Sequence, residues 1–67
     1  MGDTAEYQVI LSTTQGDSVE RDVHADDAIH AALIVGSQYH LGTLRDGRGR
    51  TPRGTIRAVL ARRITGE

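Results

Sequence analysis

The chain contains no cysteine, phenylalanine or tryptophan, so its core must be built from aliphatic side chains and two tyrosines. Its 67 residues have room for one domain only. A domain this small buries about 60% of the surface that its unfolded chain exposes, which makes its stability marginal. Without cysteine, neither disulfides nor thiolate zinc sites can add stability. Self-association remains, so a homodimer is one expected state.

The first patterned segment predicts a β-hairpin. Residues 7–13 alternate apolar and polar side chains and are rich in β-branched residues, which is typical of a strand. Residues 14–17, Thr-Gln-Gly-Asp, have turn chemistry, and Val19 and Val23 then share one face of a second strand. Arg21 falls on that same face, which indicates an edge strand where its stem lies along the core and its head reaches water.

A helix is predicted over about residues 27–40. Asp26 is a good N-cap, Asp27 adds negative charge where the helix dipole favours it, and Gly42 is placed to end the helix. The residues predicted to form its apolar face are Ala28, Ile29, Ala32, Leu33, Gly36 and Tyr39. Ile34 lies outside this face, which indicates either an isolated exposed residue or a partner surface.

The last third of the chain begins with a predicted mobile loop at residues 45–54, which contain three glycines, one proline and four arginines and no apolar anchor. Residues 55–64 fit two periods. With period two, the shared face is Ile56, Ala58, Leu60 and Ile64; with period 3.6, behind a Thr55 cap, it is Ile56, Val59, Leu60 and Ile64. Helix propensity favours a helix, but a third strand makes a more stable sheet than a lone hairpin. We predict the strand, with a second helix as the alternative.

These elements predict an α+β fold of the ββαβ type, in which an antiparallel hairpin and a third strand pack on one helix. The domain is expected to span residues 7–64, after a flexible N-terminus at residues 1–6. The longest apolar stretch, residues 31–36, is far shorter than the roughly 20 residues of a membrane span, and no basic-then-apolar leader opens the chain. We therefore expect a cytoplasmic protein that does not bind membranes.

The order of these segments resembles a known group of proteins. A Tyr7-x-Val9 strand and a polar turn lead to a second strand ending in Val23-His24-Ala25, and Asp26-Asp27-Ala28-Ile29 then opens an alanine-rich helix. Over residues 7–36 this looks like short accessory proteins of bacteriophages, especially those of actinobacterial hosts. The resemblance implies a ββαβ fold and a host-directed or regulatory role, and it carries no catalytic residue.

The charge of the chain is divided along its length. Residues 1–44 carry a net charge of −6, and residues 45–67, whose basic residues are all arginine, carry +5. Arginine beside glycine suits phosphate, and counterion release adds affinity. The candidate nucleic-acid-binding residues within segment 45–63 are Arg45, Arg48, Arg50, Arg53 and Arg57. A pI near 6.3 and the lack of aromatic residues in this segment favour a solvated loop instead, partly neutralised by the acidic half.

The acidic half suggests a protein partner. Glu20 and Asp22, together with Ile34, are the candidate protein-binding residues, because an acidic face can dock on a basic surface of a host protein. The simpler interpretation is that these acids are ordinary solvent-facing strand positions. We predict a non-enzymatic binding or regulatory protein that engages a partner protein as an inhibitor or adaptor, with nucleic-acid binding as the alternative.

No residue pattern predicts catalysis, a metal site or a cofactor. Asp27 and His30 are spaced to form a pair on a helix, but no further histidine at helical spacing completes a metal site. Ser37 and His40 lack a third group to orient a base. Residues 47–51 are glycine-rich but lack the lysine of a phosphate-binding P-loop.

Overall fold

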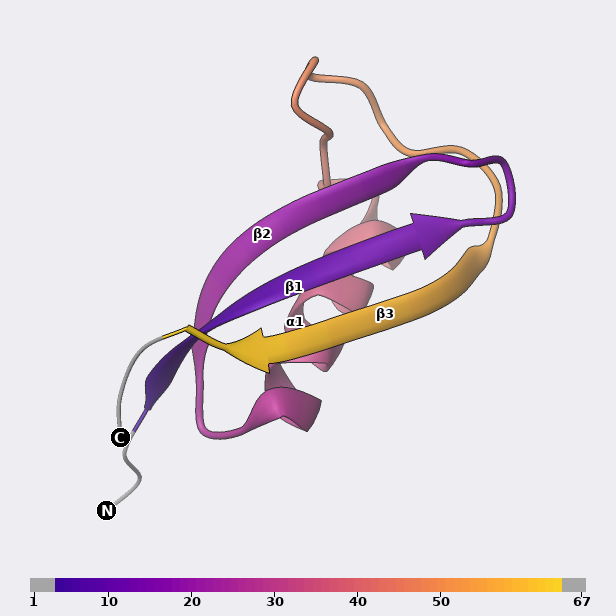
Figure 1. Ribbon diagram of the computed structural model, residues 1–67. Coiled ribbons are helices and arrows are strands. Elements are labelled where there is room, and N and C mark those ends of the chain that lie inside the picture. Colours follow the sequence, from indigo (N-terminus) through magenta and orange to yellow (C-terminus); the bar gives the residue numbers. More distant parts are fainter. Residues whose placement is uncertain (1–3, 65–67) are drawn as a thin grey trace.

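The computed structural model describes residues 4–64 and confirms the predicted α+β fold. The elements are β1 (Ala5–Thr13), β2 (Ser18–Ala25), α1 (Ala28–Leu41) and β3 (Ile56–Arg63). The strands form one antiparallel sheet in the order β2-β1-β3, and α1 covers one face of it (Figure 1). The final segment is therefore the predicted strand and not the alternative helix.

Two boundaries differ slightly from the predictions. β1 begins at Ala5, whereas the flexible N-terminus was expected to include residues 1–6; of these, residues 1–3 lie outside the described part of the chain. The N-cap of α1 is Asp27 and not Asp26, and its Oδ1 accepts a hydrogen bond of 2.8 Å from the His30 amide. This hydrogen bond lowers the pKa of Asp27.

β1 contributes the largest share of the buried core residues, because it is the central strand and its odd-numbered side chains all face α1. These buried residues are Ala5, Tyr7, Val9, Leu11 and Thr13. Thr13 is the polar member of the row, and its Oγ1 accepts a hydrogen bond of 3.2 Å from the Asp17 amide as the chain turns into β2. A buried hydroxyl that is satisfied in this way does not incur the cost of an unpaired polar group.

The predicted glycine ends the helix. Gly42 adopts a φ of +76°, a left-handed conformation that favours glycine, and its amide donates to the Tyr39 carbonyl at 3.1 Å. The chain then turns back so that Leu44, only 1% exposed, enters the core. In the part of the chain that the structure describes, no helix is long and apolar enough to cross a membrane.

The face of α1 that packs on the sheet differs in part from the predicted one, of which Ala28 and Tyr39 do pack against the core. Ala31 and Val35 are fully buried, whereas Ile29 and Leu33, which were assigned to the core, are 73% and 59% exposed. Ala31 has a small side chain, which lets the helix approach the sheet closely. Leu44 supplies from outside the helix a large side chain that this narrow stripe lacks. The larger apolar residues of α1 are therefore left facing outward.

β3 contains an irregularity that neither predicted period included. The register shifts between Ser12 and Thr13 of β1, and Arg57 is the additional residue on β3. Because of this bulge, Ile56 lies on the opposite face from Leu60. The β3 residues that pack against the core are Ile56, Val59 and Ala61. The open face instead carries Leu60, which is 62% exposed, so the apolar face predicted from the sequence is wrong.

We predict that Leu44→Ala lowers the free energy of unfolding by about 2–5 kcal/mol, because it leaves a cavity in the core. A core of this size supplies only about 3–5 kcal/mol, so much of the variant should be unfolded. Urea denaturation followed by circular dichroism measures the change. Leu41→Ala is the matched control, since Leu41 lies on α1 and is 77% exposed. Equal losses in the two variants would contradict the burial of Leu44.

Candidate functional site

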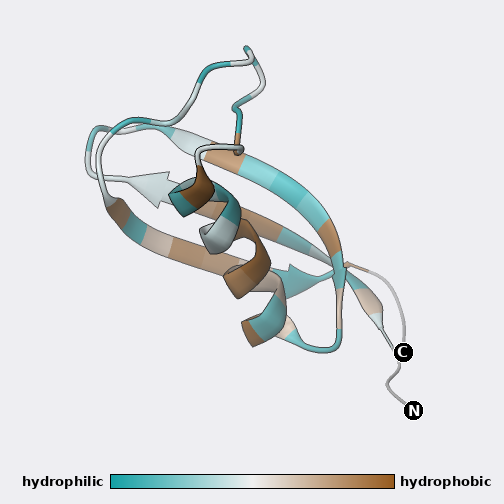
Figure 2. Cartoon of the chain, turned by 180° about the vertical axis from the view of Figure 1, so that it is seen from behind, coloured by the Kyte–Doolittle hydropathy of each residue, from teal (hydrophilic) through white to brown (hydrophobic). Residues whose placement is uncertain are grey.

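An apolar groove of about 420 Å³ lies between α1 and β3. We call it the α1–β3 groove, and its lining residues are Ile29, Ala32, Leu33, Gly36, Ser37, His40, Ile56 and Val59. In Figure 2, where α1 lies in front of the sheet, apolar residues occur along the helix and along β3 beside it. A helix that is apolar on both its sheet side and its outer side is typical of one covered by another protein surface.

The groove borders an open sheet edge. In the described part of the chain, β3 pairs with β1 alone and its outer edge has no neighbouring strand. The Ile64 amide donates to the Glu6 carbonyl at 2.8 Å, and in an antiparallel ladder the direction of bonding alternates along the strand. The backbone N–H and C=O groups of Val59 and Ala61 therefore point outward. This edge can accept an added strand whose side chains would enter the groove.

Basic residues flank this edge. Arg57 is exposed at the bulge, and Arg62 is exposed on the open face of the sheet, where its Nε donates to Gln8 Oε1 at 3.2 Å. Neither side chain is within ion-pair distance of a carboxylate in residues 4–64. The edge of β3 therefore combines an apolar groove with positive charge.

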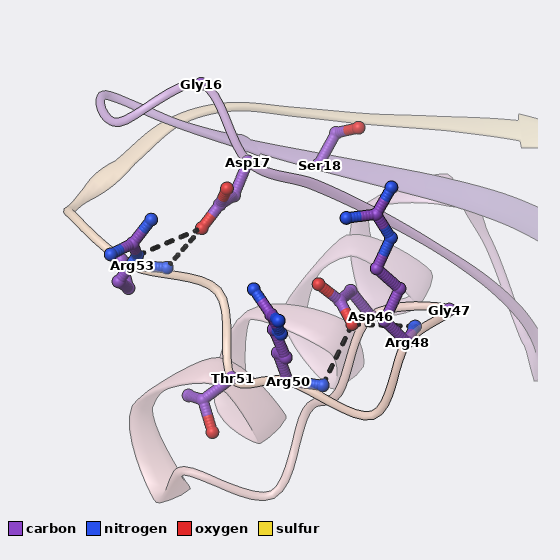
Figure 3. Close-up of a pocket in the computed structure, with 9 residues that line it drawn as sticks. All are labelled: Gly16, Asp17, Ser18, Asp46, Gly47, Arg48, Arg50, Thr51 and Arg53. Carbon is purple, nitrogen blue, oxygen red and sulfur yellow. Dashed lines mark hydrogen bonds and ion pairs between the residues drawn. The ribbon is translucent and has the colours of Figure 1, made fainter.

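A second hollow, of about 780 Å³, lies between the 45–54 loop and the β1–β2 turn. We call it the arginine hollow, because Arg48, Arg50 and Arg53 line it together with Asp17 and Asp46. Figure 3 shows the side chains of Arg48 and Arg50 extending from the loop into the space beneath the hairpin turn. Three of the five arginines predicted to bind nucleic acid are thus brought together.

Asp46 shapes the loop on one side of the hollow. Its Oδ1 accepts hydrogen bonds from the Arg48 amide at 2.8 Å and the Arg50 amide at 2.9 Å, and its own amide donates to the Arg50 carbonyl at 2.8 Å. The amide bonds from Arg50 and then Arg48 hold the pKa of Asp46 below its ordinary value. The carboxylate is therefore engaged with backbone N–H groups.

The other side of the loop is fastened to the hairpin turn. Asp17 Oδ2 accepts a hydrogen bond of 2.8 Å from the Arg53 amide, and Arg53 Nε lies 4.0 Å from the same oxygen. Two residues further on, the Thr55 amide donates to Thr14 Oγ1 at 3.2 Å and the Thr14 amide donates to the Thr55 carbonyl at 2.9 Å. These bonds join segments that are about forty residues apart in the sequence and bring the loop back into β3.

Arg45 and Arg57, the other two predicted nucleic-acid-binding residues, lie outside the hollow. The Arg45 guanidinium donates to the carbonyls of Gly42 at 2.6 Å and Leu44 at 3.2 Å, at the C-terminal end of α1. Its own carbonyl accepts a hydrogen bond from the Arg21 guanidinium. Arg21 is half-buried on the edge strand β2, as the sequence predicted. Arg57 lies on β3.

The three predicted protein-binding residues do not form one surface. Glu20 and Asp22 pair with Ile10 and Gln8, so their exposed side chains lie on the open face of the sheet. Ile34, 37% exposed, lies on α1 across the sheet from them. Sequence reasoning missed the roles of Ile29 and Leu33 in a surface, because it assigned both to the core. No signal within the helix sequence separated these two residues from the core, because apolar residues occur on every side of it.

His24 and His30 line one hollow beside the start of α1, and His40 lines the α1–β3 groove. His30 Nδ1 lies 3.0 Å from Asp27 Oδ1, an exposed pair at the start of α1. Among residues 4–64, no group of three or more histidines, aspartates and glutamates is arranged to hold a metal ion. No protein-family model, curated protein or solved structure matches the chain.

We predict that Gly54→Ala detaches the 45–54 loop from the hairpin turn. Gly54 has a φ of +91°, and an added Cβ would lie 2.6 Å from Gln15 Cγ and 2.8 Å from Thr14 Oγ1. The backbone strain alone costs about 1–3 kcal/mol, and thermal unfolding measures the loss. Gly47→Ala is the control, because a Cβ there meets no described atom within 4 Å. A Gly54→Ala variant as stable as Gly47→Ala would contradict the close contact.

We predict that acid loosens the turn around Asp46. Because the folded pKa of Asp46 is lowered, its stabilisation is complete above about pH 4, the ordinary range of an aspartate, and is lost as the pH falls through the folded pKa. NMR titration of the Arg48 and Arg50 amides measures this transition. In Asp46→Asn, the side chain still accepts hydrogen bonds but does not titrate, so the transition should disappear. A transition that persists in this variant would contradict the assignment.

Proposed function

We propose that the protein is a non-enzymatic binding module that holds a partner protein in the α1–β3 groove and acts as an adaptor or inhibitor. The observation that supports this proposal is the exposure of Ile29 and Leu33 beside the half-buried Ile56 and Val59. Covering one such side chain completely is worth about 1.5–3 kcal/mol. Isolated exposed apolar residues are common on protein surfaces, but a row that continues across two elements marks an interaction site.

The proposed partner segment is an extended strand that carries apolar and acidic side chains. It adds to the outer edge of β3 by bonding to the outward N–H and C=O groups of Val59 and Ala61. Its side chains on the helix side fill the groove against Leu33. Acidic residues on the same segment meet Arg57 and Arg62, whose charges are not paired with carboxylates in residues 4–64. Backbone bonding then supplies affinity and the groove supplies specificity.

The charge of β3 disfavours a second copy of this chain as the occupant. An antiparallel pair of two β3 strands in which the outward groups of Val59 bond to those of Ala61 places Arg57 of one copy opposite Arg63 of the other. Like charges directly opposite each other destabilise a strand pair. The arginines of β3 therefore disfavour self-pairing in this register, while Arg57 and Arg62 attract an acidic strand. A homodimer remains the main competing occupant and is an outcome of the test.

We predict that Leu33→Ser weakens capture of the partner by about tenfold or more, as expected for a side chain at the centre of an interface. The full chain serves as bait in a host lysate, and the captured protein is identified. Its affinity for each variant is then measured by calorimetry, and the amides that shift on binding are mapped by NMR. Shifts should concentrate along the α1–β3 groove, and the affinity should fall as salt is added.

Leu41→Ser is the matched control, because Leu41 is 77% exposed on the same helix but does not line the groove, whereas Leu33 is 59% exposed in the groove. The control should bind as tightly as the unchanged protein. Equal weakening in both variants, or shifts confined to the open face, would overturn the proposal. Sedimentation gives a separate check: a dimer that Leu33→Ser dissociates would show that a second copy fills the groove.

A further inference from the structure

The carboxylates of the arginine hollow are engaged with backbone N–H groups. Asp46 Oδ1 accepts from the Arg48 and Arg50 amides, and Asp17 Oδ2 accepts from the Arg53 amide. Arg53 Nε is 4.0 Å from Asp17, and that guanidinium is largely exposed, so the ion pair contributes little. Both acids therefore serve mainly to hold the loop in shape.

The guanidinium groups of the hollow remain available to a ligand. Within residues 4–64, the side chains of Arg48 and Arg50 make no hydrogen bond and no ion pair, although both feel the charge of Asp46. Arg45 differs, because its guanidinium already donates hydrogen bonds to carbonyl oxygens just beyond the end of α1. Three arginines against two aspartates leave the hollow with a net positive charge.

We infer that the arginine hollow binds a phosphate group. Guanidinium groups present planar forks of N–H donors that match the oxygens of phosphate, and two such groups enter this space from one short loop. Ser18 of β2 also lines this space. A volume of about 780 Å³ exceeds that of one phosphate ion, so it leaves room for the molecule that carries the group. This site is separate from the α1–β3 groove and does not rest on the protein-binding proposal.

The hydrogen bonds that hold the 45–54 loop in one conformation also hold its arginines in place for a ligand. Arg48 and Arg50 are two residues apart on a turn whose amides are tied to one oxygen of Asp46, at 2.8 and 2.9 Å. The far end of the loop is tied to the hairpin through Asp17 and Thr14. Fixing these backbone segments before binding lowers the entropy that a ligand must remove. The site is therefore expected to lose affinity when the loop is detached, even with every arginine present.

The test uses NMR titration of the full chain with inorganic phosphate, against chloride at equal ionic strength. We expect saturable shifts of the amides of residues 46–53. The double variant R48Q/R50Q should bind about tenfold more weakly or worse, the effect of losing charge-assisted hydrogen bonds. For the binding of inorganic phosphate, R57Q is the matched control, because Arg57 is exposed on β3 outside the hollow. Both arginines of the double variant are exposed and lack side-chain partners in the described chain, so the fold should be retained.

A second titration, with a single-stranded oligonucleotide that lacks terminal phosphates, identifies the source of the phosphate. Tighter binding with added shifts at Arg57 and Arg62 supports a nucleic-acid backbone as the source. Saturation by inorganic phosphate without tighter binding of the oligonucleotide supports a small phosphate-bearing molecule. The inference is overturned by the absence of saturable shifts with both probes, or if R57Q weakens the binding of inorganic phosphate as much as R48Q/R50Q does.

Discussion

The rest of the structure depends on the packing of the Ala31 and Val35 stripe of α1 against the inward row of β1. Residues two apart in a helix are separated by about 200° around its axis, so burying Ala31 necessarily turns Ile29 and Leu33 away from the sheet. The orientation of α1 about its own axis therefore determines both which residues enter the core and which line the α1–β3 groove. Within residues 4–64, the three-stranded sheet has a single helix to cover it, and that helix can pack only one of its apolar sides against the sheet.

The features that could be predicted from the sequence are those with a local cause. Alternation of side chains marked β1, turn residues marked the hairpin, and Gly42 marked the end of α1. The choice of strand over helix for residues 55–64 came from what a sheet needs and was confirmed. The predicted helix face was wrong at Ile29 and Leu33, because apolar residues lie all round α1 and the sequence alone does not show which of them face the sheet. The bulge at Arg57 likewise depends on how β3 pairs with β1, so the sequence of residues 55–64 alone does not predict it.

For the arginine hollow, the composition of the sequence predicted the charged residues, and the structure shows which of them lie together. The sequence indicated a basic, glycine-rich segment and a compensating acidic half, and it placed five arginines together as candidates. In the structure, Arg48, Arg50 and Arg53 meet because Asp46 and Asp17 bind backbone amides, the second of these across 36 positions of the chain. The aspartates therefore interact with the basic loop chiefly through its backbone N–H groups and not through its guanidinium groups. The acids order the loop, while two of the guanidinium groups stay free of carboxylate partners in residues 4–64.

Exposure of the α1–β3 groove also bears on how such a small domain remains folded. Its core offers only about 3–5 kcal/mol of net stability, and covering Ile29 or Leu33 completely would add about 1.5–3 kcal/mol for each side chain. A partner that binds only the folded chain stabilises it further as its concentration rises above the dissociation constant. Folding and binding are then linked through the same apolar residues. In the proposed complex, filling the groove would offset the cost of leaving large side chains outside the core, and the partner would complete the packing that α1 and the described sheet leave unfinished.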